Sequence, residues 1–185
     1  MGLFEDYTPR KHAGHRKTLP AGLIIRPAKA EDISSLAKLT FSREGGELAR
    51  IKEKFENELT NLDATGAGLL LVAELNSKIV GFSRVKYFKP TSDSPANICP
   101  EGWYLTGVIV AAEYRRQGIA IALTRARLDW IAKRARQAYY FANAQNKVSI
   151  DLHKRFGFVE LTRDFVYPEV EFTGGEGILF KADFP

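Results

Sequence analysis

The sequence predicts a single α/β domain, and three features support this prediction. Apolar runs of strand length alternate with segments that carry apolar residues at helical spacing. No repeat and no linker divides the 185 residues, a length that suits one domain. The apolar run Trp103–Val110 reads as a buried strand, and it leads through a short polar turn into a long helix from Gly118. We expect residues 22–185 to form the domain, preceded by a basic extension, residues 1–21.

The first half of the chain predicts two helices between its first strands. Residues 23–26 read as a strand closed by Pro27, and a helix follows with Asp32 as a plausible N-cap. Gly45 and Gly46 break the pattern before a second helix, 47–61. Two strands, residues 69–75 and 78–87, are joined by a turn at Asn76–Ser77 and form a hairpin. A long polar loop, residues 89–102, then leads to the central strand.

The second half alternates strands and helices after the central strand. The long helix carries apolar residues at helical spacing, and its basic residues, Arg127 among them, read as mostly solvated. Gly157 suits the C-cap of the last helix. The predicted ranges are 118–137 (helix), 138–142 (strand), 148–156 (helix), 158–167 (strand) and 176–182 (strand).

The turn between the central strand and the long helix suits a phosphate group. A helix N-terminus presents unpaired N–H groups and partial positive charge, and Arg115 and Arg116 add two full charges. Gly118 lets a ligand approach the backbone closely. The turn matches neither G-x-x-x-x-G-K-[ST] nor G-x-G-x-x-G, so it is not a nucleoside-triphosphate loop or a dinucleotide fingerprint.

Two motifs resemble the GNAT N-acetyltransferase superfamily. Arg115-Arg-Gln-Gly118-Ile-Ala120 matches R-x-x-G-x-A directly after a strand, the superfamily's acetyl-coenzyme A signature. Asn146-Lys-Val-Ser149 through Gly157-Phe158 is similar to a second segment, N-x-x-S-x-x-L-[Y/H]-x-x-x-G-F. The resemblance implies a mixed, mostly antiparallel sheet of six to seven strands, flanked by about four helices and splayed at its central strands.

The resemblance also assigns cofactor-binding residues by position. The central strand would offer backbone groups to the pantetheine arm, the turn would bind the pyrophosphate, and the last helix would contribute an amide and a hydroxyl. The residues are Val108, Ile109 and Val110; Arg115, Arg116, Gln117, Gly118, Ile119 and Ala120; and Asn146 and Ser149. The walls of the acceptor site would come from residues 41–46 and the acidic, Gly-rich loop 167–177.

The implied chemistry is direct acetyl transfer to an amine. The backbone N–H of Val110 would donate a hydrogen bond to the negative charge that develops on the thioester oxygen. His153 stands where relatives often carry a tyrosine and is the candidate general acid, although it can equally be a packing residue. The central strand offers Leu105 and Thr106 where many relatives have a carboxylate, so Glu101, Tyr104 or a water held by Thr106 remain for the base.

The composition limits the partners and the cellular location that the protein can have. A net charge of +5, spread along the chain, suits a polyanionic cofactor without requiring nucleic acid. The single Cys99, the absence of an apolar leader and the absence of a membrane-length apolar run predict a cytoplasmic protein with an incidental thiol. We expect no metal; the resemblance makes a homodimer an option.

These observations predict an acetyl-CoA-dependent N-acetyltransferase that acts on the primary amine of a small molecule, aminoglycoside-like or polyamine-like. Two alternatives stay open: a peptide or protein N-acetyltransferase, and a non-catalytic acyl-CoA-binding sensor. The sensor gains weight from the missing strand carboxylate, and the phosphate-binding turn does not discriminate because a sensor needs it too.

Overall fold

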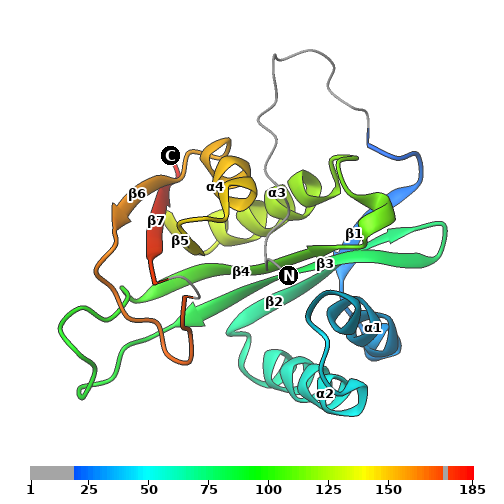
Figure 1. Cartoon of the computed structure of the whole chain (residues 1–185), viewed down its shortest axis with the longest axis horizontal. Helices are drawn as coiled ribbons and strands as arrows, with labels where there is room; N and C mark the ends of the chain where they lie inside the picture. Colours follow the sequence, from blue (N-terminus) through cyan, green and yellow to red (C-terminus); the bar gives the residue numbers. More distant parts are fainter. Residues whose placement is uncertain (1–18, 173–174) are drawn as a thin grey trace. The chain divides into compact units, whose positions relative to one another are not determined.

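A computed structural model describes residues 19–172 and 175–185. Within this part of the chain, seven strands form an open sheet in the order β1-β2-β3-β4-β5-β7-β6, accompanied by four α-helices (Figure 1). The β1–β2, β2–β3, β5–β7 and β6–β7 pairings are antiparallel. The predicted α/β class and the predicted numbers of strands and helices are confirmed, whereas the splay of the central strands stays a prediction.

The predicted elements are all present, with shifted ends. The bounds are β1 (Leu23–Pro27), α1 (Ile33–Glu44), α2 (Leu48–Thr65), β2 (Gly68–Leu75), β3 (Lys78–Phe88), β4 (Gly102–Val110), α3 (Ile119–Ala132), β5 (Gln137–Asn143), α4 (Lys147–Lys154), β6 (Val159–Thr162) and β7 (Gly177–Asp183). The largest errors are α3, which ends five residues before the predicted end at Gln137, and β6, which is much shorter than 158–167. Of the predicted N-terminal extension, residues 1–18 lie outside the described residues.

Contacts group the described chain into two compact units. The α1–α3 unit comprises residues 19–86 and 105–130, and the α4 unit comprises residues 87–104 and 131–185. Strand β4 contributes to both, with its first three residues in the α4 unit and the rest in the α1–α3 unit.

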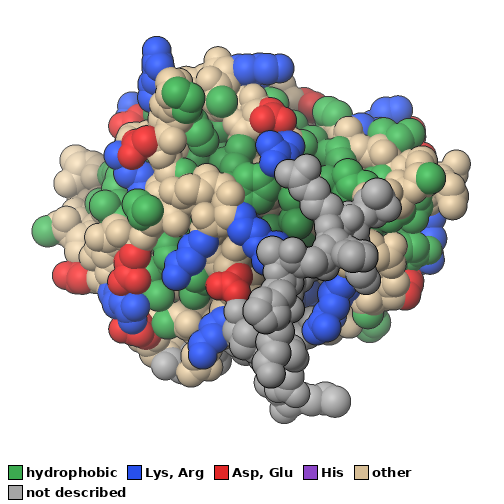
Figure 2. Space-filling model, turned by 90° about the horizontal axis from the view of Figure 1, so that it is seen from above, with side chains coloured by type: hydrophobic (Ala, Val, Ile, Leu, Met, Phe, Trp, Pro, Cys, Tyr) green, Lys and Arg blue, Asp and Glu red, His purple; other side chains and the backbone are tan. Residues whose placement is uncertain are grey.

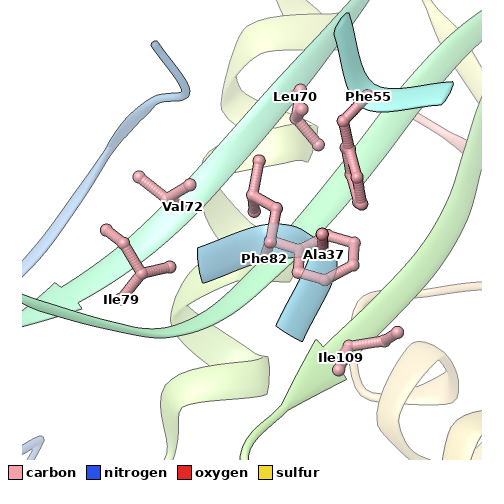
Figure 3. Packing of buried hydrophobic residues seen from close by; sticks show 8 residues of the cluster. Ala37, Phe55, Leu70, Val72, Ile79, Phe82 and Ile109 are labelled. Atoms are coloured by element: carbon pink, nitrogen blue, oxygen red, sulfur yellow. The ribbon is translucent and has the colours of Figure 1, made fainter. Parts of the chain in front are cut away.

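The α1–α3 unit has a core on each face of its strands. Figure 1 shows α1 and α2 on one face of β1–β4 and α3 on the other. On the α1–α2 face, Phe55 meets Phe82 edge to face, with ring centroids 5.5 Å apart (Figure 3). On the opposite face, Ile119 and Leu123 of α3 pack against β2 and β3. Burial of this apolar surface on both faces stabilises the layered arrangement.

Two charged side chains of this unit differ from the sequence prediction. Asp32 is buried and makes no side-chain cap; its carboxylate instead accepts two bonds from Arg26, at 2.7 and 2.9 Å, and one from the Lys29 N–H at 2.8 Å. Arg127 is buried rather than solvated, and it donates to the Thr124 hydroxyl at 2.9 Å and to the Arg84 carbonyl. A hydrophobic pattern does not reveal such partners because it records apolar spacing and not which polar groups bind one another.

The α4 unit has an aromatic core on both faces of β5. Tyr139 stacks on Tyr104 at 5.1 Å on one face, and Tyr140 stacks on His153 of α4 at 3.7 Å on the other. Side chains alternate across a strand, so neighbouring tyrosines enter separate cores. Both tyrosines are buried.

Candidate functional site

At the C-terminal end of β4, two backbone carbonyls on one edge bind arginine side chains. The Ala111 N–H donates to the Val80 carbonyl, and the Ile109 carbonyl faces Gly81, so residues 109 and 111 point toward β3. Because backbone groups alternate along a strand, those of Val108 and Val110 point the other way. Their carbonyls accept from Arg43 Nη1 at 3.0 Å and Arg115 Nε at 3.1 Å. This edge therefore offers polar backbone groups to a strand-like ligand.

The turn after β4 forms a concave set of N–H groups. A 3-10 turn, Ala112–Tyr114, is followed by Arg116 and Gly118 with φ of +60° and +86°. Left-handed residues within a turn can direct successive N–H groups to one point, an arrangement that binds anions. A left-handed arginine is uncommon, and such strain is concentrated at functional positions.

The turn fits a pyrophosphate. The N–H groups of Arg116, Gln117 and Gly118 donate to no other backbone group of the described residues. They stand at the N-terminus of α3, where the helix dipole adds positive charge. A Cβ on Gly118 would lie 3.0 Å from Leu19 Cδ2, and its φ disfavours any side chain. Gly118 is thus required by backbone conformation, and Leu19 adds an apolar neighbour that the sequence did not predict.

Strand β4 carries an irregularity that sequence reasoning missed. Gly107 is exposed in mid-strand with φ of +58°, a conformation that interrupts regular pairing. Beside it, Thr106 Oγ1 is buried and has no hydrogen-bond partner among the described residues. A glycine within a β-type apolar run was the available signal for the irregularity. A buried hydroxyl of this kind usually binds a water or a ligand.

A pocket of about 520 Å³ opens beside this strand, within the α1–α3 unit. Its apolar floor is Ile51, Phe55 and Ile109, and its mouth includes the Gly45–Gly46 turn. The resemblance had assigned an acceptor wall to residues 41–46; of these, 41–44 are the end of α1 rather than a loop. The charged lining residues are Glu44, Glu47, Arg50, Lys54 and Arg84.

The polar groups of α4 are bound within their own unit. Asn146 caps the helix, with Oδ1 accepting from the Ser149 N–H at 3.2 Å. The Ser149 hydroxyl is 2.7 Å from the Tyr140 hydroxyl, which donates to it. These contacts explain why Asn and Ser stand three residues apart without any ligand, so their role in cofactor binding stays a prediction.

His153 is buried at 3% exposure, stacked on Tyr140 and edge to face with Phe158. Its Nδ1 lies 2.8 Å from the Ser149 carbonyl. A carbonyl only accepts a hydrogen bond, so Nδ1 carries the proton in this contact. These contacts fix the orientation of the ring. A fixed orientation is needed whether His153 acts as a general acid or only supports the structure.

Tyr104 does not suit the predicted role of base. The side chain is fully buried, its hydroxyl donates to the Pro100 carbonyl at 2.7 Å, and burial raises the pKa of the phenol far above its ordinary value. The ring belongs to an aromatic cluster with Tyr139 and Tyr167, which argues against this role. Cys99 lies in the same cluster, where burial raises the pKa of its thiol to about 11, consistent with an unreactive cysteine.

Glu101 stands at the opposite end of β4 from the turn. Its carboxylate accepts from the Tyr87 hydroxyl at 2.6 Å, and this bond raises the pKa of Tyr87. Glu101 lies nine positions before Val110 in the chain and precedes the first residue of β4. That separation makes Glu101 a weak base for chemistry near the C-terminal end of β4.

Charge on the remaining surface is mixed. In the face shown in Figure 2, Lys and Arg side chains lie among Asp and Glu rather than in one continuous patch. In the loop 167–177, whose residues 173–174 lie outside the described residues, the Glu176 carboxylate binds Arg163 at 2.7 Å. This carboxylate is therefore engaged before any acceptor amine arrives.

The sequence profile of the acetyltransferase (GNAT) family matches residues 31–158, which is more than half of the chain. The chain belongs to the GNAT acetyltransferase family. The predicted resemblance and the prediction of an acetyltransferase are confirmed. No curated protein matches the sequence.

Solved structures of acetyltransferases share the fold. Ribosomal-protein-alanine N-acetyltransferase from Brucella melitensis superposes with a TM-score of 0.68 at 21% identity, over 87% of this chain and 99% of that one. PaiA N-acetyltransferase from Thermoplasma acidophilum in complex with coenzyme A gives 0.60 at 21%, over 88% and 99%. YncA, a putative acetyltransferase from Salmonella typhimurium with its cofactor acetyl-CoA, gives 0.65 at 16%, over 89% and 95%.

Two features are absent from the described residues. None of their helices has the length and apolar character needed to cross a membrane. They contain no group of three or more His, Cys, Asp or Glu side chains placed to hold a metal ion.

Proposed function

We propose that the protein transfers the acetyl group of acetyl-CoA to the primary amine of a small molecule. The observation that carries the proposal is the end of β4. There, outward-facing backbone groups at Val108 and Val110 adjoin the N–H groups of Arg116–Gly118. A cofactor that pairs a strand-like amide arm with a pyrophosphate needs both features side by side.

The chain's residues would bind acetyl-CoA in two ways. The N–H groups of Arg116, Gln117 and Gly118 would receive the pyrophosphate, together with those of Ile119 and Ala120 in the first turn of α3. Val108 and Val110 would pair with the pantetheine amides, with Arg43 and Arg115 yielding or sharing the carbonyls they now bind. Bound acetyl-CoA supplies the activated thioester.

In the proposed reaction the amine nitrogen attacks the thioester carbonyl carbon. A C–N bond forms, the C–S bond breaks, the nitrogen loses a proton, and the CoA thiolate gains one. The Val110 N–H points to the same edge as its carbonyl and would donate to the oxyanion. As the doubly protonated imidazolium, His153 would give its Nε2 proton to the thiolate, while Nδ1–H keeps its bond to the Ser149 carbonyl.

We propose that a water bound to Thr106 accepts the proton that the acceptor amine loses. Its hydroxyl is buried, has no partner among the described residues and lies next to the irregularity at Gly107. A bound water there would relay the amine proton toward solvent. Tyr104 is removed from consideration by its burial, and Glu101 by its distance along β4.

The pocket supports a small acceptor. At about 520 Å³ with an apolar floor, it matches the size of sites that bind small molecules. Peptide acetylation and acyl-CoA sensing remain the alternatives, and the cytoplasmic location and homodimer remain predictions.

The proposal is tested by measuring CoA thiol release from acetyl-CoA with primary amines, secondary amines and short peptides. We expect release only with small primary amines, with an N-acetylated product by mass. A Thr106→Val variant, nearly isosteric, should keep acetyl-CoA affinity and lose kcat by about 10-fold or more. Acetyl-CoA binding without turnover on any amine would support the sensor, and turnover only on peptides would support the second alternative.

A further inference from the structure

Arg84 of β3 is a rigidly held guanidinium at the pocket. Its Nε lies 2.9 Å from both carboxylate oxygens of Glu58, and both side chains are about four-fifths buried, with 21% and 16% exposure. The guanidinium carbon is 4.8 Å from the ring centroids of Phe55 and Phe82. Stacking and an ion pair together remove most of the side chain's freedom, so its remaining donors point in a defined direction.

Those remaining donors face β4. Nη1 and Nη2 of Arg84 make no hydrogen bond with a described residue, since both of its side-chain bonds start from Nε. A Cβ on Gly107 would lie 3.4 Å from Nη1, so the guanidinium stands against the exposed glycine. A residue with a side chain at position 107 would occupy the space next to these two nitrogens.

Two more cations line the same pocket. Arg50 and Lys54 are four residues apart on the face of α2 that also carries Ile51 and Phe55, and neither forms an ion pair with a described residue. Glu44 and Glu47 lie at the glycine turn. The lining of the pocket thus carries three cations and two carboxylates, a balance that does not favour a polyamine or an aminoglycoside.

We propose that the acceptor carries a carboxylate as well as its amine, and that Arg84 binds this carboxylate through Nη1 and Nη2. The paired nitrogens of a guanidinium match the geometry of a carboxylate, and Arg50 and Lys54 add attraction. An amino acid or an ω-amino acid has this chemistry. The inference rests on the proposed function, which brings the thioester to β4, and it replaces the polycationic acceptors considered from the sequence.

The experiment compares matched acceptors that differ only in the carboxylate. The pairs are phenylalanine with 2-phenylethylamine, leucine with 3-methylbutylamine, and a series of ω-amino acids with the corresponding alkylamines. Initial rates of CoA thiol release give kcat/KM for each. We expect the native protein to prefer the acid in at least one pair by about 10-fold or more.

The Arg84→Gln variant should lose this preference, with kcat/KM falling for the acid and unchanged within a few-fold for the amine. Glu58→Gln breaks the same ion pair but keeps the guanidinium, so it controls for lost stability and should retain the preference. Lys52→Gln, on another face of α2, is the charge-matched control for Lys54→Gln. Acetyl-CoA affinity, measured by calorimetry, reports that each variant is folded.

The outcomes separate the two proposals. Acetylation of amines with no preference for a carboxylate, or a preference that survives Arg84→Gln, overturns the carboxylate site and leaves the proposed function standing. Failure of the native protein to acetylate any primary amine, despite binding acetyl-CoA, overturns both.

Discussion

The end of β4 and helix α4 carry the two motifs that identify the family, but they use their polar groups differently. At β4, the carbonyls of Val108 and Val110 accept from arginine side chains, and the N–H groups of Arg116–Gly118 have no backbone partner among the described residues. In α4, Asn146 caps the helix and Ser149 accepts from Tyr140. Two equally recognisable motifs can therefore differ in what they do: one leaves backbone groups for a ligand, and the other uses its side chains to build a helix.

The largest expected effect comes from Gly118→Trp. The residue has φ of +86° and a neighbour 3.0 Å from its would-be Cβ, so a side chain both strains and obstructs the turn. Acetyl-CoA affinity, measured by calorimetry, should fall about 100-fold or more. Gly157→Trp is a matched control, because Gly157 has φ of +83° and open space around it, and it should keep its affinity. Equal losses in both variants would show that backbone strain alone is responsible.

His153→Gln tests whether α4 supplies only structure. Glutamine can still donate to the Ser149 carbonyl but cannot act as a proton donor near neutral pH. If His153 protonates the thiolate, kcat should fall by about 100-fold with acetyl-CoA affinity retained, and the histidine-dependent limb of the kcat–pH profile should disappear. A lower melting temperature with kcat unchanged would assign the ring to packing against Tyr140.

Asp32→Asn tests the polar cluster of Asp32, Arg26 and Lys29. This cluster stabilises the same unit that contains the turn after β4, but we expect it to have no part in ligand binding. Burial alone would raise the pKa of Asp32, but bonds from Arg26 and the Lys29 N–H outweigh it and lower the pKa below the ordinary value. The variant should lose about 3 kcal/mol of unfolding free energy at pH 7, with acetyl-CoA affinity unchanged.

The ion pair of Asp32 and Arg26 also predicts that the free energy of unfolding depends on pH. A folded-state pKa below the unfolded value means that the contribution is present above about pH 4 and is lost as the pH falls through the folded pKa. Urea titrations at pH 7 and pH 3 should therefore differ less for Asp32→Asn than for the native protein. An equal pH response in both would contradict the assignment.

The smallest expected effect is that of Arg116→Gly. Glycine relieves a left-handed conformation that arginine adopts with strain, so unfolding free energy should not decrease. Loss of the charge should weaken acetyl-CoA binding by about 5–10-fold, as expected for one phosphate contact. Unchanged affinity, measured at low and moderate salt, would show that the backbone N–H groups bind without help from this side chain.

The sequence alone determined the order of the elements, the turn between β4 and α3, and the family. These depend on local chemistry: the apolar run of β4, the glycine that starts α3 and the spacing of Asn146, Ser149 and Gly157. The physical reason is that turns and helix termini depend on residues only a few positions apart.

Tertiary structure alone decided which polar groups are available to a ligand. Tyr104 looked like a possible base until the fold placed it beside Tyr139, and Arg84 gave no signal until the fold set it between two phenylalanines, Glu58 and Gly107. Burial and the partners that change a side chain's pKa or orientation come from residues distant in the chain. No local pattern encodes those contacts, so the chemistry of the pocket could be read only from the folded protein.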